Sequence, residues 1–411
     1  MAPQNRLYLD NAATSFPKPP GVAEAVARYM TEVGASPGRG AYAESRTGAS
    51  VIADCRELIA DLIGLKTPER VIFTLNCTDA LNMAIKGVVF KALRYGSRPH
   101  LITTPLDHNS VLRPFNALAE RGWADWTCLH ADPETGLVDP NDLRRAIRTE
   151  TALVSLVHAS NVSGVLQPID ELVKVCREAG VPVLIDAAQS VGHLQIDIAE
   201  IGADFLAFPG HKGLLGPLGT GVLAIRPGAE TLLDTWREGG TGSVSEQDTQ
   251  PEGLPDRFEP GSHNTPAIAG LACALRWLHE QGVDRIRAHE LELIERVLER
   301  LPEAQLAGFR LLGPQSPGQR VAVFSFAHES ADPHELADRL EDDHAVLVRA
   351  GIHCAPRAHE THATISTGAL RLSFGPFNTP DDADRAMDAL VKVGEATLTR
   401  GPIPTSAPAT G

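Results

Sequence analysis

Short apolar runs and helix-spaced segments alternate along residues 51–226. The runs that read as strands lie at 70–74, 100–104, 151–160, 181–190, 203–208 and 219–227. Segments with apolar residues at helical period follow the first three of them. The runs are continuous rather than alternating, which is typical of strands covered on both faces. The pattern therefore predicts an α/β fold with a mostly parallel sheet and helices packed on each side.

The pattern changes after residue 238. Residues 239–262 are polar and rich in glycine and proline, which predicts a long loop. Two helices are expected over the next forty or so residues, followed by a small sheet built from "RVAVFSF", "AVLVRA" and "ALRLSFG". A last helix begins with Thr379 as N-cap and Pro380 at its first position. A second, smaller α+β domain is predicted at about 262–400, and the proline-rich tail 401–411 is predicted to be disordered.

Composition narrows the possible partners and compartment. The 411 residues carry a formal net charge of -15 and no run of lysine or arginine, which argues against a nucleic-acid partner. The first ten residues lack the basic start and apolar block of a signal peptide, and no apolar stretch is long enough to span a membrane. The six cysteines form no CxxC pair, so each is first interpreted as a small core residue. We expect a cytoplasmic protein with no membrane partner.

Chemically useful side chains come directly after the predicted strands. In open α/β sheets, ligands bind at the carboxyl ends of the strands. The side chains at those positions are Thr78, His108, His158, Ser160, Asn161, Asp186, Gln189, His211 and Lys212.

Asp186 and Lys212 allow two interpretations. A buried aspartate needs a neutralising cation, so the two residues can form a purely structural ion pair. They also match the needs of pyridoxal 5'-phosphate (PLP), which takes a lysine amine on its aldehyde and an acid at its ring nitrogen. The PLP phosphate needs a helix N-terminus with further donors, which Thr78 and His211 can supply. His108 is the candidate for a planar residue against the ring.

An ordered series of motifs resembles one family. The chain resembles the class V aminotransferase-fold PLP enzymes, most closely their cysteine desulfurase and selenocysteine lyase branch, over about residues 7–395. The motifs are "YLDNAATSFPKP", "VIFTLNCTDALN", "DHNSVLRP", "VHASNVSGVLQPI", "LIDAAQSVGHLQID", "AFPGHKGLLGPLGTGVL", "HNTPAIAGL", "GIHCAP" and "RLSFGPFNTPDDAD". This resemblance implies the type I PLP architecture, with a large domain at 16–261 holding a seven-stranded type of sheet. The N-terminal arm, 1–15, then joins 262–400 in the small domain, and the active site lies at a homodimer interface.

The resemblance also implies a role for each site residue. Lys212 would be the Schiff-base lysine and proton shuttle, and Asp186 would pair with the ring nitrogen. Gln189 would bind the ring hydroxyl, and His108 would stack on the ring and assist proton transfer. Further residues are assigned to the phosphate (Thr78, His211 and, from the second subunit, Thr265), to the substrate carboxylate (Asn161 and Arg371) and to the pocket floor (Asn11, Ala12 and Ala13). Without the resemblance, Arg371 reads as a solvated arginine on an edge strand, and His158 and His193 read as packed or capping histidines.

Cys354 discriminates between the reactions open to this family. It lies in a polar, glycine-flanked stretch between two predicted strands of the small domain. Exposure there would let its thiolate act, with His353 and Arg357 able to stabilise the negative charge. The cysteine desulfurase branch carries its nucleophile in this "CAP" context. Two alternatives remain: an inert loop cysteine, or a zinc site of His353, Cys354, His359 and His362, whose spacing fits no common closed site.

The sequence thus predicts a PLP-dependent cysteine desulfurase. Cys354 would attack the sulfur of bound L-cysteine, leaving L-alanine and a persulfide on Cys354, for a sulfur-acceptor protein. No metal is expected. The alternatives are a selenocysteine or cystine lyase, an aminotransferase-type enzyme, and a non-catalytic protein that keeps the fold.

Overall fold

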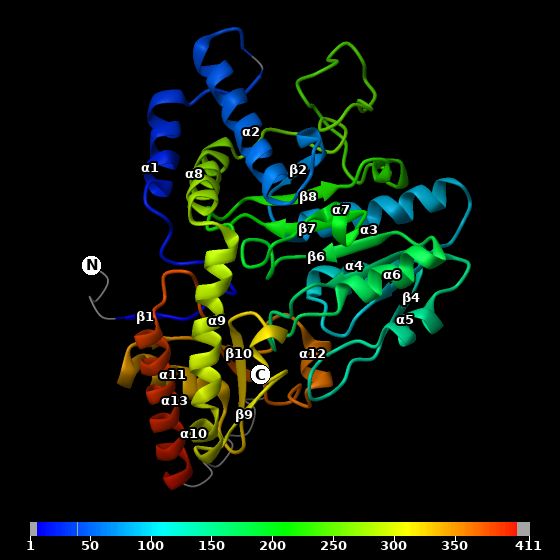
Figure 1. Cartoon of the computed structure of the whole chain (residues 1–411). Helices are drawn as coiled ribbons and strands as arrows, with labels where there is room; N and C mark the ends of the chain where they lie inside the picture. Colours follow the sequence, from blue (N-terminus) through cyan, green and yellow to red (C-terminus); the bar gives the residue numbers. More distant parts are fainter. Residues whose placement is uncertain (1–5, 39, 401–411) are drawn as a thin grey trace, which may run out of the picture.

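The computed structural model describes residues 6–38 and 40–400 (Figure 1). The tail at 401–411 that was predicted to be disordered lies outside these residues. Two groups of strands are visible, a large sheet in the upper half of Figure 1 and a smaller one below it. The long helix α9 (Val283–Glu299) runs from the upper half to the lower.

The large sheet has seven strands in the order β2-β8-β7-β6-β5-β3-β4. β4, β3, β5, β6 and β7 are parallel neighbours, whereas β8 is antiparallel to both β7 and β2. The strands are β2 (Val71–Thr74), β3 (His100–Thr103), β4 (Asp125–Cys128), β5 (Thr151–Val157), β6 (Val183–Asp186), β7 (Phe205–Pro209) and β8 (Gly221–Ile225). The predicted α/β class and the mostly parallel sheet are confirmed. β4 was not predicted, because its residues are half-exposed at the sheet edge and form no apolar run.

Helices cover both faces of this sheet. The cores on the two faces hold residues of α2, α5, α6, α7 and α8 on one side and of α3 and α4 on the other. These helices are α2 (Ala43–Leu62), α3 (Cys77–Arg94), α4 (Asn109–Glu120), α5 (Pro140–Ala146), α6 (Ile169–Ala179), α7 (Ile198–Ile201) and α8 (Thr265–Gln281); α1 (Val22–Arg28) packs against α8. Cover on both faces explains why the strands are continuously apolar.

The smaller part of the molecule has two sheets. One is four-stranded, in the order β12-β13-β10-β9, and its neighbouring strands are antiparallel. The other pairs β1 (Leu7–Tyr8) with β11 (Val346–Leu347), so the N-terminal segment lies in the same core as the C-terminal residues. The remaining elements are β9 (Phe309–Leu311), β10 (Val323–His328), β12 (Arg349–Gly351), β13 (Ala369–Ser373), α10 (Leu301–Leu306), α11 (Pro333–His344), α12 (Pro356–Thr361) and α13 (Pro380–Arg400).

Side-chain caps fix the helix starts that matter for the site. Asn76 accepts a hydrogen bond from the Asp79 amide at the start of α3, and the His108 imidazole accepts one from the Ser110 amide at the start of α4. At α13 the predicted cap is present, with the Thr379 hydroxyl accepting from the Asp382 amide. The two caps on α3 and α4 place the helix N-termini at the carboxyl edge of the large sheet.

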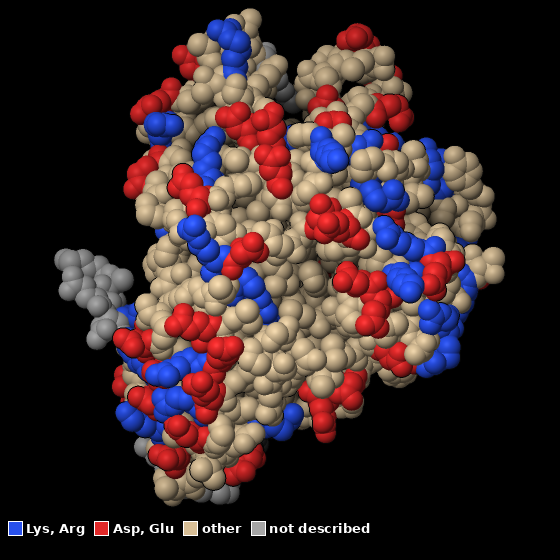
Figure 2. All heavy atoms as spheres, viewed as in Figure 1, with Lys and Arg blue, Asp and Glu red and all other residues tan. Residues whose placement is uncertain are grey.

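Three general features concern the molecule as a whole. Among the described residues, no helix is long and apolar enough to cross a membrane. All six cysteines are free thiols. On the face drawn in Figure 2, acidic and basic side chains are intermixed rather than gathered into one basic area.

Candidate active site

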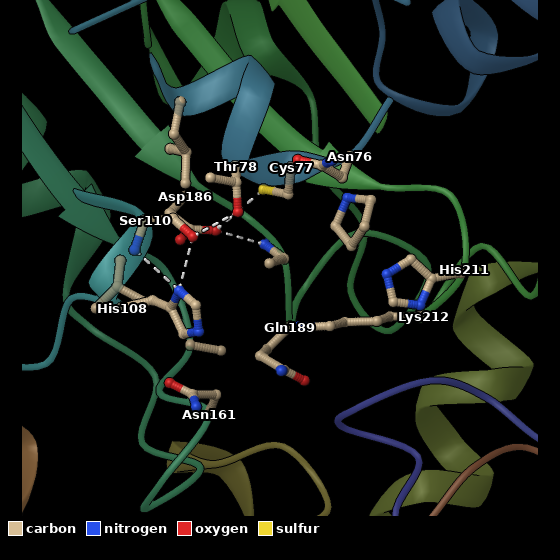
Figure 3. A pocket seen from close by; sticks show the side chains of 15 residues that line it. Asn76, Cys77, Thr78, His108, Ser110, Asn161, Asp186, Gln189, His211 and Lys212 are labelled. Atoms are coloured by element: carbon tan, nitrogen blue, oxygen red, sulfur yellow. Dashed lines mark hydrogen bonds between the residues drawn. The ribbon is translucent and has the colours of Figure 1, made fainter. Parts of the chain in front are cut away.

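A cavity of about 130 Å³ lies at the carboxyl ends of the central strands (Figure 3). It brings together seven side chains that were singled out from the sequence: Thr78, His108, Asn161, Asp186, Gln189, His211 and Lys212. Three more polar lining residues, Asn76, Cys77 and Ser110, were not predicted to belong to the site. In Figure 3, His108 and Ser110 lie on one side of the cavity and His211 on the other.

The turn that carries Lys212 is built by close backbone packing. A Cβ on Gly213 would lie 2.2 Å from the Val191 carbonyl oxygen, and one on Gly210 would lie 2.2 Å from the Thr220 hydroxyl. Only glycine allows these approaches. Burial lowers the pKa of Lys212 from its usual value, which favours the neutral, nucleophilic amine.

The N-terminal segment holds the residue before Lys212. The carbonyl oxygen of His211 accepts hydrogen bonds from the Ser15 amide at 3.0 Å and from the Lys18 ammonium at 3.1 Å. Lys18 is partly buried, and this burial lowers its pKa to about 8. Neither Ser15 nor Lys18 was predicted to belong to the site. The resemblance assigned only Asn11, Ala12 and Ala13 of the N-terminal arm, and no local pattern shows that Ser15 and Lys18 contact the Lys212 turn.

Asp186 ends β6 inside the protein. Its carboxylate accepts from the Ala188 amide at 3.0 Å and lies 3.9 Å from the Cys77 sulfur. Burial raises its pKa. In the described part of the chain no ion pair joins Asp186 directly to Lys212, although their charges influence one another. A direct structural ion pair between the two is thus not found in the described residues; both groups face the same cavity.

A hydrogen-bonded chain links α3 to α4 across the cavity. The Thr78 and Ser110 hydroxyls are 2.8 Å apart, and the Ser110 hydroxyl is 2.8 Å from His108 Nδ1. Burial, followed by the charge of Lys212, lowers the pKa of His108 to about 4. The imidazole is therefore neutral near pH 7 and presents an uncharged planar face.

The donor set fits PLP. Lys212 supplies an amine, Asp186 an acid on another side of the cavity, and the α3 N-terminus with Thr78 a place for a phosphate. His211 Nδ1 is buried and has no hydrogen-bond partner within the described residues, so a donor or acceptor there is left for a ligand. These residues would hold PLP as the resemblance implies.

Arg371 is buried in an internal strand. It lies on β13 between β12 and β10 and is 1% exposed, so its interpretation as a solvated edge-strand arginine is wrong. One guanidinium nitrogen donates to the Asn161 carbonyl at 3.0 Å and another to Asp10 at 2.6 Å. Nε is buried and has no partner among the described residues. Both terminal nitrogens are thus engaged within the chain, and Arg371 is not among the residues that line the cavity, so its binding of a substrate carboxylate stays a prediction.

Arg349, on β12, was missed in the sequence. Its charge acts on His108, Lys212 and Arg371, which places it beside the same site. It had no local signal, because it stands in the apolar run "AVLVRA".

The predicted pocket floor is committed to other contacts. The Asn11 amide donates to the Ser373 carbonyl and accepts from the Phe16 amide, both at 3.1 Å. The Ala12 carbonyl accepts from Gln189 at 2.9 Å. Asn11, Ala12 and Ala13 are not among the residues that line the cavity of this chain. Their contribution within one subunit is to position Gln189 and the small domain.

Thr265 is the first residue of α8 and does not line the cavity of its own subunit. The preceding Asn264 donates to the Gly219 carbonyl at 3.2 Å, beside the turn after Lys212. This position leaves open the role across a subunit interface that the resemblance implies.

Cys354 is exposed, as expected, in the turn between β12 and α12. The two residues expected to act on its thiolate, His353 and Arg357, have other surroundings. Arg357 lies over the Trp126 ring, with its guanidinium carbon 5.0 Å from the centroid, and interacts with Cys128. Burial lowers the pKa of His353 to about 2, so this imidazole is uncharged. His353 therefore offers no positive charge to Cys354, and Arg357 contacts Trp126 and Cys128 instead, whereas the charge of Arg371 interacts with Cys354.

The zinc alternative has no support in the geometry. Among the described residues, no group of three or more histidines, cysteines or acids is placed to hold a metal ion. His362 faces the Pro133 carbonyl, whereas His353 and His359 contact each other.

Of three other expectations, the first two were partly wrong and the third was right. Cys55 and Cys176 are core residues, but Cys77 lines the cavity, and Cys128 and Cys273 are only partly buried. His193 forms an ion pair with Glu290 rather than simply packing. His158 is packed, with a buried Nδ1 that has no partner among the described residues.

A buried acid lies next to His108. One oxygen of Asp107 accepts from the hydroxyls of Thr103 and Thr104 and from the Thr104 amide, and the other has no partner among the described residues. Burial raises the pKa of Asp107 to about 7, and the charge of Asp186 adds to the effect. Asp107 was not predicted as a site residue, because no local pattern distinguishes it from the adjacent His108.

Comparisons with known proteins show the family to which the chain belongs. The family model for aminotransferase class-V matches residues 7–386, and the chain belongs to that family. A probable cysteine desulfurase of Methanothermobacter thermautotrophicus is 33% identical, with 95% of each chain covered. A cysteine desulfurase of Haloferax volcanii is 32% identical, covering 93% of this chain and 88% of the relative.

Solved structures give the same result. The apo cysteine desulfurase from Thermococcus onnurineus superposes with a TM-score of 0.87 at 32% identity, covering 95% of both chains. The cysteine desulfurase CsdA from Escherichia coli gives 0.83 at 26% identity, again over 95% of both. The predicted family and fold are confirmed.

Proposed function

We propose that this protein is a PLP-dependent cysteine desulfurase that removes sulfur from L-cysteine, giving L-alanine and a persulfide on Cys354. The observation that carries the proposal is the placement of one exposed thiol beside the cavity. The Cys354 carbonyl accepts a hydrogen bond at 2.8 Å from the amide of Asn109, the residue after His108. The names of the relatives support the same activity.

Each residue has a part in the reaction. PLP, when bound, supplies an electron sink conjugated with the α-carbon of the substrate. Lys212 would hold the cofactor and move protons at the α-carbon, while Asp186 would bind the ring nitrogen and Gln189 the ring hydroxyl. Thr78 and His211 would hold the phosphate, and His108 would cover the ring. Arg371, with Asn161, binds the substrate carboxylate and so orients the thiol toward Cys354.

The sulfur transfer balances without an outside oxidant. The Cys354 thiolate attacks the substrate sulfur, forming an S–S bond as the carbon–sulfur bond breaks. The electron pair of the broken bond goes to the substrate β-carbon, which takes up a proton and leaves as part of alanine. The sum is cysteine plus enzyme thiol giving alanine plus enzyme persulfide.

The test replaces Cys354 by alanine and measures alanine and sulfide formed from cysteine under reductant. We expect Cys354→Ala to retain bound PLP and to lose sulfide release, and we expect wild-type enzyme without reductant to gain the mass of one sulfur on the peptide holding Cys354. Cys273→Ala, a partly exposed cysteine on α8, is the matched control and should keep full activity. Full activity of Cys354→Ala on cysteine would refute persulfide catalysis and turn attention to the lyase or aminotransferase alternatives.

The enzyme is further proposed to act as a homodimer. Phe16, Leu75 and Leu218 are exposed apolar side chains close in sequence to residues of the proposed site. A second subunit would cover them. Thr265 would then reach the phosphate of the partner subunit. Light scattering of the purified protein tests this directly: a monomeric enzyme with full activity would contradict it.

The remaining expectations concern the surroundings of the enzyme. Six free thiols suit a reducing compartment, which supports a cytoplasmic location. A persulfide on an exposed residue needs a thiol or similar nucleophile to take the sulfur, so a sulfur-acceptor protein is proposed as partner. Faster alanine formation on adding a candidate acceptor, in the absence of reductant, would identify it.

A further inference from the structure

The turn that carries Cys354 has an unfavourable backbone. His353 has φ 52° and Cys354 has φ 58°, and neither is glycine. A side-chain-bearing residue in the left-handed region costs about 1–2 kcal/mol, and such residues persist only where their surroundings hold them. Two in succession therefore require specific restraints.

Two restraints act on the backbone. The Asn161 side-chain amide donates to the His353 carbonyl at 2.7 Å, and the Asn109 amide donates to the Cys354 carbonyl at 2.8 Å. Both donors belong to the part of the chain that holds the large sheet, at the ends of β5 and the start of α4. These bonds tie the carbonyls of both left-handed residues to the part of the chain that lines the cavity.

A third restraint is a chain of side chains behind the turn. His353 is 4% exposed, whereas its neighbour Cys354 is exposed to solvent. His353 Nδ1 lies 3.3 Å from His359 Nε2, and the two rings stack with centroids 5.5 Å apart. His359 Nδ1 lies 2.8 Å from the Thr364 hydroxyl, and His353 Nε2 lies 3.4 Å from the Arg349 carbonyl.

The groups at the two ends of this hydrogen-bonded chain determine which ring nitrogens of His353 and His359 carry hydrogen. The Arg349 carbonyl only accepts, so His353 Nε2 carries hydrogen and its Nδ1 accepts. His359 must then donate from Nε2 and accept at Nδ1, which makes the Thr364 hydroxyl the donor. Burial lowers the pKa of His359 to about 4 as it lowers that of His353, so both rings stay neutral near pH 7. The chain thus has one direction, which the Arg349 carbonyl sets and in which the Thr364 hydroxyl is the donor at the other end.

We infer that His359, acting through His353 and oriented by Thr364, is a positioning residue that holds the Cys354 turn in the conformation that brings its sulfur to the substrate. The inference rests on the proposed role of Cys354 as the nucleophile. The chain does not touch the cavity, because none of its three members lines it. Its loss should therefore slow sulfur transfer while cofactor and substrate binding persist.

The test compares variants of His359 and Thr364 in the holoenzyme. His359→Ala removes the donor to His353, and we expect kcat to fall about tenfold or more with KM changed less than about threefold. His359→Gln keeps an N–H donor and should recover part of kcat. Thr364→Val should lower kcat less than His359→Ala, and Thr364→Ser should match wild type. His362→Gln, a buried histidine on the same segment outside the chain, is the matched control.

Two further readouts separate positioning from a general structural role. The visible spectrum and its titration with L-alanine, the product, report cofactor and ligand binding, and both should be unchanged in His359→Ala. The alkylation rate of Cys354 by iodoacetamide, corrected with Cys354→Ala, should fall about threefold or more as the thiolate loses its place near Arg371. If His359→Ala does not fold, the same measurements of kcat, alanine binding and alkylation on Thr364→Val test the inference.

The outcomes are distinct. Unchanged kcat and alkylation in a folded His359→Ala enzyme would overturn the inference, as would a fall in kcat accompanied by an equal loss of alanine binding. If Cys354→Ala remains active on cysteine, the proposed function fails. The alkylation rate still decides whether the chain positions Cys354, because alkylation does not depend on desulfurase activity.

Discussion

The two turns that carry the proposed reactive groups are built in opposite ways. The Lys212 turn is buried, and glycines at 210 and 213 let the backbone pack against Thr220 and Val191. The Cys354 turn is exposed and places two side-chain-bearing residues in the left-handed region, held by Asn109, Asn161 and the His353–His359 chain. The lysine turn is fixed by close backbone packing around its glycines, whereas the cysteine turn is fixed by hydrogen bonds from side chains and backbone amides around it. A cofactor anchor must stay in one place, whereas an exposed thiol must also meet an acceptor.

The largest expected effect comes from the lysine itself. Lys212→Ala removes the amine that holds PLP and moves protons, so activity should fall by roughly 10³-fold or more. Treatment of the wild-type holoenzyme with borohydride should link the cofactor permanently to the peptide containing Lys212, as read by mass spectrometry. An unmodified Lys212 would contradict the whole assignment of the site.

Gly213→Ala tests whether close packing fixes the lysine turn. The added Cβ would lie 2.2 Å from the Val191 carbonyl and 2.8 Å from the His193 ring. We expect a loss of about 1–3 kcal/mol in the free energy of unfolding, together with weaker PLP binding. Gly253→Ala is the control, because no atom of the described residues lies within 4 Å of a Cβ built there. Equal denaturant midpoints for the two variants would show that the turn has room to adjust.

Asp107, the buried acid beside His108, gives a pH-dependent test. Burial raises its pKa to about 7, so the folded protein favours the protonated acid. The stabilising contribution is fully present below the unfolded pKa, near 4, and is lost as pH rises toward 7.

Asp107→Asn mimics the neutral acid and keeps an oxygen for Thr103 and Thr104. The variant should therefore gain stability over wild type between pH 5 and 7, on the order of 1 kcal/mol per pH unit, and the difference should level off above that. Denaturant unfolding at several pH values measures it. A stability difference independent of pH would show that Asp107 is ionised in the folded protein throughout.

The smallest effect isolates backbone strain at the cysteine turn. Cys354→Gly and Cys354→Ala both remove the thiol, but only glycine relieves the left-handed conformation at φ 58°. We expect Cys354→Gly to be more stable than Cys354→Ala by up to about 1 kcal/mol, part of the gain being offset by the flexibility of unfolded glycine. Matching thermal midpoints would mean that the turn stores no strain at this residue.

The sequence by itself determined much of this protein. Continuous apolar runs specified a covered sheet, and strand ends supplied Asp186, Gln189, His211 and Lys212, because parallel strands deliver their last residues to one edge. Cys354 was recognised by its polar, glycine-flanked setting. These features are local in the chain and follow from periodicity and residue chemistry.

Only the tertiary structure decided the rest. Ser110 joined the site through its bond to Thr78, Lys18 through the carbonyl of His211, and Arg349 through proximity to Lys212. The expected neighbours of Cys354 were replaced by others, since Arg357 turned to Trp126 and burial left His353 uncharged. Which charges reach a thiol depends on burial and on contacts between residues far apart in the chain, and neither is written in the local pattern.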